Sequence, residues 1–361
     1  MKIIVSAGGT GGHLYPALAL VNYIKKQQPD AEFLFVGTTD RLESQVVPEL
    51  GYAYRGLHVK GLVGNPIQKG INAAIFIRSL GASRKILKEF KPDIVIGFGG
   101  YPSASIVLAA ANMHIKTMIH EQNSIIGLTN KILIKRVDEI ICCYEMAYKQ
   151  FPAEKTKLLG NPRASVVTEQ QLNNVHDLYD IAPDRKVVLI VMGSLGSATI
   201  NDLMVDALKK MQSEDYDVIY VTGRAHYDDF IPQVGELDSS IHVVNYINDL
   251  PSVLSSCDLV VSRAGATTLA EITSLGIASI IIPSPYVVAN HQEYNARELE
   301  SKDAALMILE KDLKADSFVE TINSVLYDDE KRESLKTHAK AMGKPNACAD
   351  IYQEILELLG E

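Results

Sequence analysis

Short apolar runs alternate with longer amphipathic stretches over the first half of the chain. The apolar runs are bounded by turn residues, and a stretch such as LYPALALVNYIKKQQ (14–28) has the spacing of a helix with one apolar face. This alternation is typical of βαβ units, in which helices cover both faces of a parallel sheet. We therefore expect strands in the runs at 2–7, 32–37, 93–100, 116–121 and 139–144.

The same alternation of apolar runs and amphipathic stretches starts again after residue 163, which indicates a second domain of the same class. Further apolar runs begin at 186, 217, 241, 258 and 278. A chain of 361 residues also exceeds the usual size of one hydrophobic core. The pattern predicts two doubly wound α/β domains, 1–162 and 163–340, and a last helix in 341–361 that packs on one of them.

Charge is unevenly distributed along the chain, although the net charge is only −9. Residues 1–163 hold 20 Lys and Arg against 12 Asp and Glu, whereas the remainder holds 15 against 32. Within the basic half, the segment 60–92 interleaves seven basic residues and one Glu with isoleucines. This composition fits contact with anionic lipid, but a solvated helix face over ordinary core contacts is the simpler interpretation of the residues alone.

The sequence gives no sign of export or of a membrane span. It has no run of about 20 apolar residues, and its first residues have the pattern of a strand and not of a signal peptide. We therefore expect a cytoplasmic protein. Its cysteines lack C-x-x-C spacing, so we expect core thiols and not zinc ligands or disulfides at Cys142, Cys143, Cys257 and Cys348.

The stretch GGTGGH (8–13) places four glycines and a histidine directly after the first predicted strand. Glycines between a parallel strand and a helix let backbone N–H groups approach a bound anion, typically a phosphate. The dinucleotide pattern G-x-G-x-x-G is broken by Leu14, and G-x-x-x-x-G-K-[ST] is absent, so neither a nicotinamide dehydrogenase nor an ATPase is favoured. His13 begins the helix, where a neutral imidazole can accept a proton; a structural histidine is the alternative.

Polar residues follow several other predicted strands. In an open parallel sheet, ligands bind at the carboxyl ends of the strands, so these stretches are expected to line a binding site. Ser194 and the amides of 265–268 suit a phosphate, whereas Glu271 either holds paired ribose hydroxyls or is a favourable acid near a helix start. The stretches are GFGGYPSAS (97–105), HEQNSIIGLTNK (120–131), MGSLGS (192–197) and SRAGATTLAEITSLG (262–276).

Six segments taken in order resemble the MurG family, bacterial glycosyltransferases that move N-acetylglucosamine (GlcNAc) from UDP-GlcNAc onto lipid I to make lipid II. The segments are GGTGGHLYPALAL, GFGGYPS, HEQNSIIGLTNK, GNPR, SRAGATTLAEI and NHQEYNA. The resemblance implies the GT-B fold: two Rossmann-like, doubly wound parallel-sheet domains that face each other across a cleft. The N-terminal domain would face the acceptor and the membrane, the C-terminal domain would bind UDP-GlcNAc, and the last helix would return to the N-terminal domain.

The resemblance also implies a reaction and its surroundings. The 4-hydroxyl of the N-acetylmuramyl sugar would displace UDP with inversion, without a metal or a cofactor, in peptidoglycan synthesis. The partners would be UDP-GlcNAc, lipid I and, through residues 60–92, the anionic cytoplasmic surface of the cell membrane, where the protein would be peripheral; no nucleic acid is expected. Another GT-B glycolipid glycosyltransferase or a UDP-GlcNAc 2-epimerase is the alternative.

Site residues follow from the same resemblance. His13 is the first candidate for the base that deprotonates the acceptor, and Glu121 is the second. The acceptor would contact Gly8, Gly9, Tyr101, His120 and Asn130. The donor would be held by Thr10, Gly11, Gly12, Asn123, Arg163, Ser194, Ile247, Ala266, Thr267, Thr268, Leu269, Glu271, Gln292 and Asn295.

Overall fold

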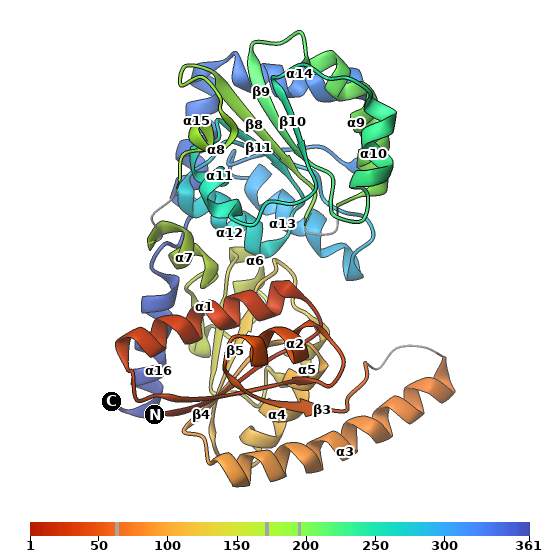
Figure 1. Ribbon diagram of the computed structural model, residues 1–361. Helices are drawn as coiled ribbons and strands as arrows, with labels where there is room; N and C mark the ends of the chain where they lie inside the picture. Colours follow the sequence, from red (N-terminus) through yellow and green to blue (C-terminus); the bar gives the residue numbers. More distant parts are fainter. Residues whose placement is uncertain (62–64, 170–172, 194–195) are drawn as a thin grey trace. The chain divides into compact units, whose positions relative to one another are not determined.

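The computed structural model describes residues 1–61, 65–169, 173–193 and 196–361 (Figure 1). The chain forms two compact units. Unit 1 comprises Met1–Val166 and Asn346–Glu361, and unit 2 comprises Val167–Pro345. Both chain termini therefore belong to unit 1.

Unit 1 is built on a parallel sheet of seven strands in the order β3-β2-β1-β4-β5-β6-β7. The order reverses direction between β1 and β4, as it does in doubly wound nucleotide-binding folds. The central strands are almost entirely buried, which explains their continuous apolar sequences. The strands are β1 (Lys2–Ala7), β2 (Glu32–Thr38), β3 (Ala53–Leu57), β4 (Ile94–Gly99), β5 (Lys116–Glu121), β6 (Glu139–Cys142) and β7 (Thr156–Leu158).

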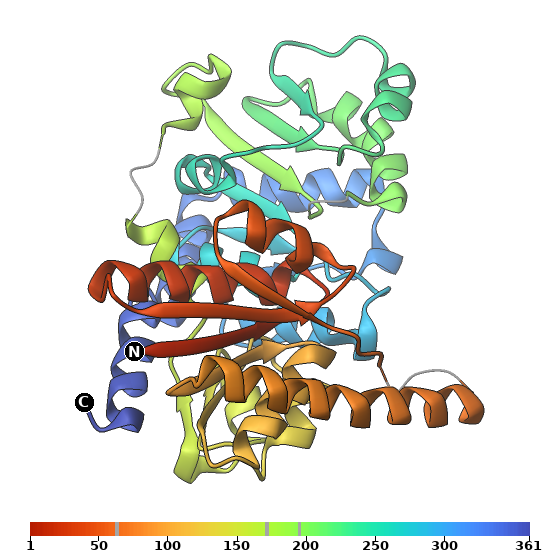
Figure 2. The same ribbon diagram turned by 60° about the horizontal axis from the view of Figure 1, so that its bottom comes forward.

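Helices cover both faces of this sheet. One core joins the sheet to α1 (Gly11–Gln27) and to the C-terminal α16 (Ala347–Leu359), whose Ile351 and Ile355 are buried. The other core lies beneath α3 (Pro66–Phe90), α4 (Tyr101–Ala111) and α5 (Leu128–Leu133). Figure 2 shows the strands of unit 1 between α1, in red, and α3, in orange. The remaining helices are α2 (Leu42–Glu49), α6 (Glu145–Tyr148) and α7 (Arg163–Glu169), the last of which continues into unit 2.

Unit 2 repeats this architecture with six parallel strands in the order β10-β9-β8-β11-β12-β13. Its core packs α9 (Ala198–Met211), α10 (Tyr227–Val234) and α14 (Ala315–Leu326) on one face of the sheet, and Figure 1 shows α11 (Leu250–Ser256) and α12 (Ala266–Leu275) on the other. The other helices are α8 (Val175–Tyr179), α13 (His291–Glu300) and α15 (Asp329–Met342). The strands are β8 (Lys186–Val191), β9 (Tyr216–Val221), β10 (Ile241–Val244), β11 (Leu259–Ser262), β12 (Ser279–Ile281) and β13 (Leu306–Met307).

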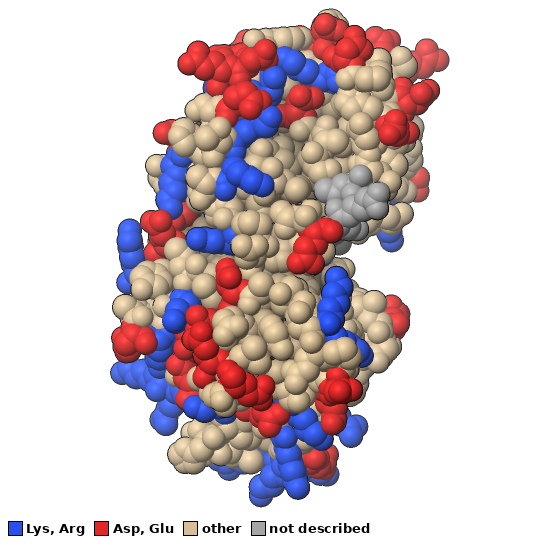
Figure 3. Space-filling model, turned by 90° about the vertical axis from the view of Figure 1, so that its left-hand side faces the viewer, with Lys and Arg blue, Asp and Glu red and all other residues tan. Residues whose placement is uncertain are grey.

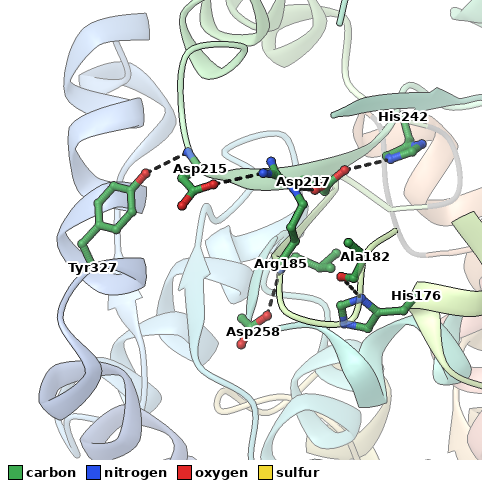
Figure 4. Close-up of polar contacts among 9 residues, drawn as sticks. His176, Ala182, Arg185, Asp215, Asp217, His242, Asp258 and Tyr327 are labelled. Carbon is green, nitrogen blue, oxygen red and sulfur yellow. Dashed lines mark hydrogen bonds and ion pairs between the residues drawn. The ribbon is translucent and has the colours of Figure 1, made fainter. Parts of the chain in front are cut away.

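Polar side chains fasten the amino ends of three strands of unit 2 (Figure 4). Arg185, directly before β8, pairs with Asp215 (3.0 Å) and with Asp217 at the start of β9. Asp217 also accepts a hydrogen bond from Nε2 of His242 on β10 (3.3 Å). Because ligands of such sheets bind at the carboxyl ends of the strands, we assign this network to the stability of the sheet.

The predicted fold class is confirmed, since each unit is an α/β layer structure around a parallel sheet. The sequence pattern missed β3, β7 and β13. Among the described residues, no helix combines the length and the apolar character that a bilayer crossing requires.

Candidate active site

The carboxyl ends of β1 and β4 meet at the point where the strand order of unit 1 reverses. The amide of Gly8, after β1, donates to the carbonyl of Gly99 at the end of β4 (3.1 Å). The approach is so close that a Cβ on Gly100 would lie 2.6 Å from the Gly8 carbonyl oxygen. Packing therefore requires Gly8 and Gly100, whose close approach brings two of the predicted segments together.

The glycine-rich loop presents the start of α1 to solvent. Thr10 precedes the helix as its N-cap, yet its side chain makes no capping hydrogen bond. Thr10 and Gly12 are exposed, and Gly11 is half-buried. The first N–H groups of a 17-residue helix, with the favourable end of its dipole, thus face outward where a phosphate can be held.

His13 lies on the first turn of α1 with its ring against β4. Its Nδ1 is 2.9 Å from the carbonyl oxygen of Gly8, and because a carbonyl only accepts, Nδ1 carries the proton. Nε2 of the neutral ring is then an acceptor. A Cβ on Gly99 would lie 2.8 Å from this nitrogen, so the imidazole packs directly on the Gly99 backbone. The half-buried ring therefore has the tautomer that a general base needs.

Glu121, the second candidate base, organises the loop that follows β5. One carboxylate oxygen accepts from the backbone amide of Asn123 (3.1 Å). The other accepts from the amide of Gly127 (2.9 Å) and from the side chain of Asn130 (2.8 Å). Glu121 is buried, so its hydrogen bonds fix the loop and set the direction of Asn123.

His120 is placed inside the core and not at the acceptor surface where the sequence predicted it. It is 1% exposed and stacks on Phe98. Nε2 donates to the carbonyl of Gly160 (3.0 Å), and Nδ1 accepts from Gln122 (2.9 Å). Burial lowers the pKa of His120 to about 4, so the ring is neutral near pH 7. With both nitrogens bonded within unit 1, His120 connects β5 to its neighbours and has no free atom for a substrate.

The other predicted residues of unit 1 differ in exposure. Tyr101 opens α4, is 41% exposed, and packs its ring on Gly61. Asn130 is buried beneath Glu121, and its Oδ1 has no hydrogen-bond partner among the described residues. Asn123 and Arg163 are half-buried. Tyr101, Asn123 and Arg163 thus retain exposed surface for a ligand, whereas Asn130 supports the loop.

Unit 2 has an equivalent reversal of strand order between β8 and β11. The loop after β8 contains Ser194, which lies outside the described residues. The segment after β11 turns into α12 at Gly265, which provides no side-chain cap. The side-chain oxygen of Thr267 in the first turn is buried and has no hydrogen-bond partner among the described residues. An uncapped helix start with an unpaired hydroxyl is suited to the phosphates of a nucleotide.

One predicted contact at this helix is wrong. The amide of Leu269 donates to the carbonyl of Gly265 (3.0 Å) and is the first amide bonded within the helix, so it has no proton left for a phosphate. Ala266, Thr267 and Thr268 precede it and are half-buried. Glu271, one turn further on, is 4% exposed.

The last predicted donor residues are spread over two segments. Gln292 on α13 is half-buried, and its side-chain oxygen accepts from the amide of Ser284 (2.9 Å). Asn295 is fully buried, and its side chain donates to the carbonyl of Ala264 (3.2 Å). It therefore stabilises the turn before α12 and does not present an exposed group to a sugar. Ile247 is half-buried in the segment after β10.

The sequence analysis overlooked two buried residues that shape these loops. Arg263 bonds to Ser197 (2.8 Å) and to the carbonyl of Ile282 (3.2 Å), and it forms an ion pair with Glu310. It therefore joins the segments that follow β8, β11 and β12. In unit 1, Glu43 on α2 accepts from the amide of Gly9 (3.1 Å). Arg263 is a lone charge among apolar and small residues, whereas the polar sequence around Glu43 does not set it apart.

The chain matches one family over most of its length. Residues 3–142 match the glycosyltransferase family 28 N-terminal domain, and residues 187–353 match the glycosyltransferase family 28 C-terminal domain. The chain is also 42% identical, over 99% of its length and 100% of theirs, to two named relatives. These are the UDP-N-acetylglucosamine–N-acetylmuramyl-(pentapeptide) pyrophosphoryl-undecaprenol N-acetylglucosamine transferase 1 of Bacillus cereus and the corresponding transferase of Listeria monocytogenes.

Solved structures share the fold at lower identity. MurG of Acinetobacter baumannii superposes with a TM-score of 0.81 at 24% identity, covering 99% of both chains. A putative UDP-N-acetylglucosamine 2-epimerase from Listeria monocytogenes gives a TM-score of 0.73 at 14% identity, covering 99% of this chain and 96% of that one. The fold is therefore common to transferases and epimerases, and it does not by itself select a reaction.

Proposed function

The chain belongs to glycosyltransferase family 28 and, within it, to the MurG transferases; from this membership we propose that it transfers GlcNAc from UDP-GlcNAc to lipid I. Lipid I is the undecaprenyl-pyrophosphate-linked N-acetylmuramyl-pentapeptide, and the product is lipid II. The observation that carries the proposal is the 42% identity over essentially the whole of both chains to relatives named for this activity. An epimerase shares only the fold, at 14% identity.

We assign the donor to unit 2. The start of α12, with its unpaired Thr267 hydroxyl, would hold the pyrophosphate, and the buried Glu271 would hold the ribose hydroxyls. As the bond to the sugar breaks, negative charge develops on the departing UDP. Backbone amides and the helix dipole stabilise that charge without having to reorganise. Gln292 would contact the sugar from α13.

We assign the acceptor and the base to unit 1. The N–H groups at the start of α1 would hold the diphosphate of lipid I, and Tyr101 and Asn123 would line the same edge of the sheet. His13 Nε2 takes the proton of the 4-hydroxyl while the hydroxyl oxygen bonds to the anomeric carbon. The electron pair of the broken bond leaves with UDP. Attack opposite to UDP inverts the anomeric centre.

Transfer of radiolabelled GlcNAc from UDP-GlcNAc to a lipid I analogue tests the proposal directly. We expect a labelled disaccharide lipid and one UDP for each transfer. If UDP appears only with a different glycolipid acceptor, the chain is a glycosyltransferase of other specificity. If the sugar is converted to its 2-epimer without an acceptor, the chain is an epimerase.

Replacing Glu271 by Ala is expected to raise the KM for UDP-GlcNAc about 10- to 100-fold, because a charge-assisted hydrogen bond contributes about 1.5–3 kcal/mol. The KM for the acceptor should stay within about twofold. Thr273→Ala is the matched control, since Thr273 lies on the same helix and, among the described residues, its hydroxyl bonds only within α12. An equal loss of donor affinity in both variants would mean that helix integrity, and not ribose binding, depends on Glu271. Steady-state kinetics with each substrate varied decides between them.

We propose that α3 holds the protein at an anionic membrane surface. Three of its isoleucines point outward: Ile67, Ile71 and Ile77 are 76%, 56% and 67% exposed. The opposite side of the helix is fixed to α4 by buried serines, Ser79 and Ser83, which share Ser105. Exposed basic residues continue along the helix at Arg78, Arg84, Lys85, Lys88 and Lys91.

The face drawn in Figure 3 agrees with this assignment. Lys and Arg gather along its lower edge, with some Asp and Glu among them, whereas Asp and Glu predominate at its upper edge. Apolar side chains that insert, surrounded by cations that attract lipid head groups, are the features of a peripheral membrane protein. Residues 62–64, which belong to the same predicted segment, lie outside the described residues.

Introducing a carboxylate at Ile67 is expected to weaken binding to anionic vesicles about tenfold. The change removes an apolar side chain worth roughly 1.5–3 kcal/mol when buried and adds a repelled charge. Leu178→Glu, at a 48% exposed apolar position in unit 2, is the control and should bind like wild type. Co-sedimentation with vesicles of anionic or neutral lipid at two salt concentrations measures the effect. If Ile67→Glu binds anionic vesicles as well as the wild type does, the exposed face of α3 does not contact the membrane.

A further inference from the structure

A single peptide group connects a buried carboxylate to His13. The peptide that joins Gly8 and Gly9 presents its carbonyl to one side and its N–H to the other, as a trans peptide must. The carbonyl accepts from His13 Nδ1 (2.9 Å), and the N–H donates to Glu43 Oε2 (3.1 Å). The order of groups is therefore carboxylate, peptide, imidazole.

Glu43 is firmly held at the far end of this chain of hydrogen bonds. It is 2% exposed and lies in the first turn of α2, where the helix dipole favours an anion. Its other oxygen, Oε1, accepts from the amide (2.9 Å) and the hydroxyl (2.8 Å) of Thr38, at the end of β2. Among the described residues no Lys or Arg forms an ion pair with it. The carboxylate is thus satisfied by three dipoles, and one of them is the peptide that contacts His13.

We propose that Glu43 is a positioning residue for the transfer reaction and acts on His13 through the peptide between Gly8 and Gly9. The proposal rests on the function proposed above, in which His13 takes the proton of the acceptor hydroxyl. In Asp–His pairs a carboxylate bonded directly to Nδ1–H fixes the tautomer and stabilises the imidazolium. Here the peptide is inserted between the two groups.

The physical reason is the mutual polarisation of hydrogen bonds in a chain. An anion at the N–H end of an amide increases the negative charge on its carbonyl oxygen, which then accepts more strongly from Nδ1–H. When Nε2 gains the acceptor's proton, the positive ring faces this strengthened dipole. The protons on Nδ1 and on the Gly9 nitrogen stay where they are, so the relay moves charge density and not protons.

Among the described residues, His120 and Tyr54 also interact with this arrangement, and the pKa of each is shifted away from neutral pH. His120 interacts with the charge of His13, but burial lowers its pKa to about 4. Tyr54 on β3 faces Glu43 and donates to the Thr38 carbonyl (2.5 Å); burial, with the charge of Glu43 second, raises its pKa above the usual value. Neither His120 nor Tyr54 therefore accounts for a change near neutrality in the pH profile of the enzyme.

Glu43→Gln removes the anion while keeping the shape of the side chain. Whichever way the amide turns, Gly9 N–H no longer faces a carboxylate. Thr38→Val is the matched control, because it removes one hydrogen bond from the opposite oxygen of Glu43 and leaves the contact with Gly9 intact. Both variants disturb the same buried site, so a comparable change in Tm is expected for each.

The test compares kcat, its pH profile and the ring nitrogens of His13. For Glu43→Gln we expect kcat to fall about 10-fold, as is usual for groups that orient a functional histidine, with donor KM unchanged. The acid limb of the kcat/KM profile should move to lower pH, and the nitrogen chemical shifts of His13 should show less of the Nδ1–H tautomer. Thr38→Val should keep kcat within about twofold and leave the profile and the shifts unchanged.

Each other outcome decides against part of the proposal. If Glu43→Gln keeps the wild-type pH profile and tautomer, or if Thr38→Val loses as much activity, Glu43 only stabilises the loop and the relay is overturned. The nitrogen shifts are measured without substrates. A tautomer change in Glu43→Gln together with no transfer by wild type would therefore reject the proposed function and leave the link between Glu43 and His13 standing.

Discussion

Replacing His13 by Ala is expected to lower kcat for GlcNAc transfer by about 10²- to 10⁴-fold, the range over which a positioned general base accelerates a reaction. The structure supplies the reason, because Nδ1–H is committed to the Gly8 carbonyl and Nε2 is the acceptor that remains. Donor affinity should be unchanged, since we assign His13 to the acceptor hydroxyl and the nucleotide to unit 2. Transfer of labelled GlcNAc under saturating donor and acceptor measures kcat, and titration with UDP measures donor binding.

His58→Ala is the control for this variant. His58 is an exposed histidine of the same unit, after β3, and its removal should leave kcat within about twofold. A His13→Ala enzyme that retains at least half of the wild-type kcat would show that another group, or water, takes the proton. Glu121 would then need to exchange the hydrogen bonds from Asn123, Gly127 and Asn130 for the acceptor hydroxyl.

The strands that the sequence predicted are those with continuous apolar runs, because these are buried on both faces of a parallel sheet. β3 escaped prediction since it is an edge strand of polar and small residues, AYRGL, with only Leu57 buried. β7, with the sequence TKL, has no apolar run, and β13 has two residues, which is too short for a pattern to show. Local sequence therefore specified the strands with apolar runs, including the edge strand β10, whereas tertiary pairing specified the edge strands β3, β7 and β13.

The site was predictable to the level of segments but not of atoms. The rule that ligands meet the carboxyl ends of strands grouped residues 8–13 with 97–105, and the contact of Gly8 with Gly99 bears out that grouping. Which side chain faces solvent depends on neighbours far along the chain. His120 bonds to Gly160, 40 residues away, and Glu43 bonds to Gly9, 34 residues away. No local pattern contains such information.

The backbone of Gly99 packs against the imidazole of His13, and Gly99→Ala is expected to lower kcat about 100-fold. Its φ of +116° is one that residues with a Cβ rarely adopt, and an added Cβ would lie 2.8 Å from Cδ2 and Nε2 of His13. The imidazole must move away, and a displacement of about 1 Å of a reacting group costs roughly 10²-fold in rate. The backbone strain should also lower the free energy of unfolding by about 1–3 kcal/mol.

Gly81→Ala separates these effects from a general response to adding a methyl group. Gly81 lies within α3, and a Cβ there would meet no other atom within 4 Å. Alanine favours a helix interior over glycine by up to about 1 kcal/mol, so this variant should be slightly more stable and fully active. Urea unfolding and kcat, measured on both variants, test the pair. If Gly99→Ala is destabilised but keeps the wild-type kcat, the backbone strain is present and catalysis is unaffected. The edge of the His13 ring that packs on Gly99 would then not be the edge that takes the proton.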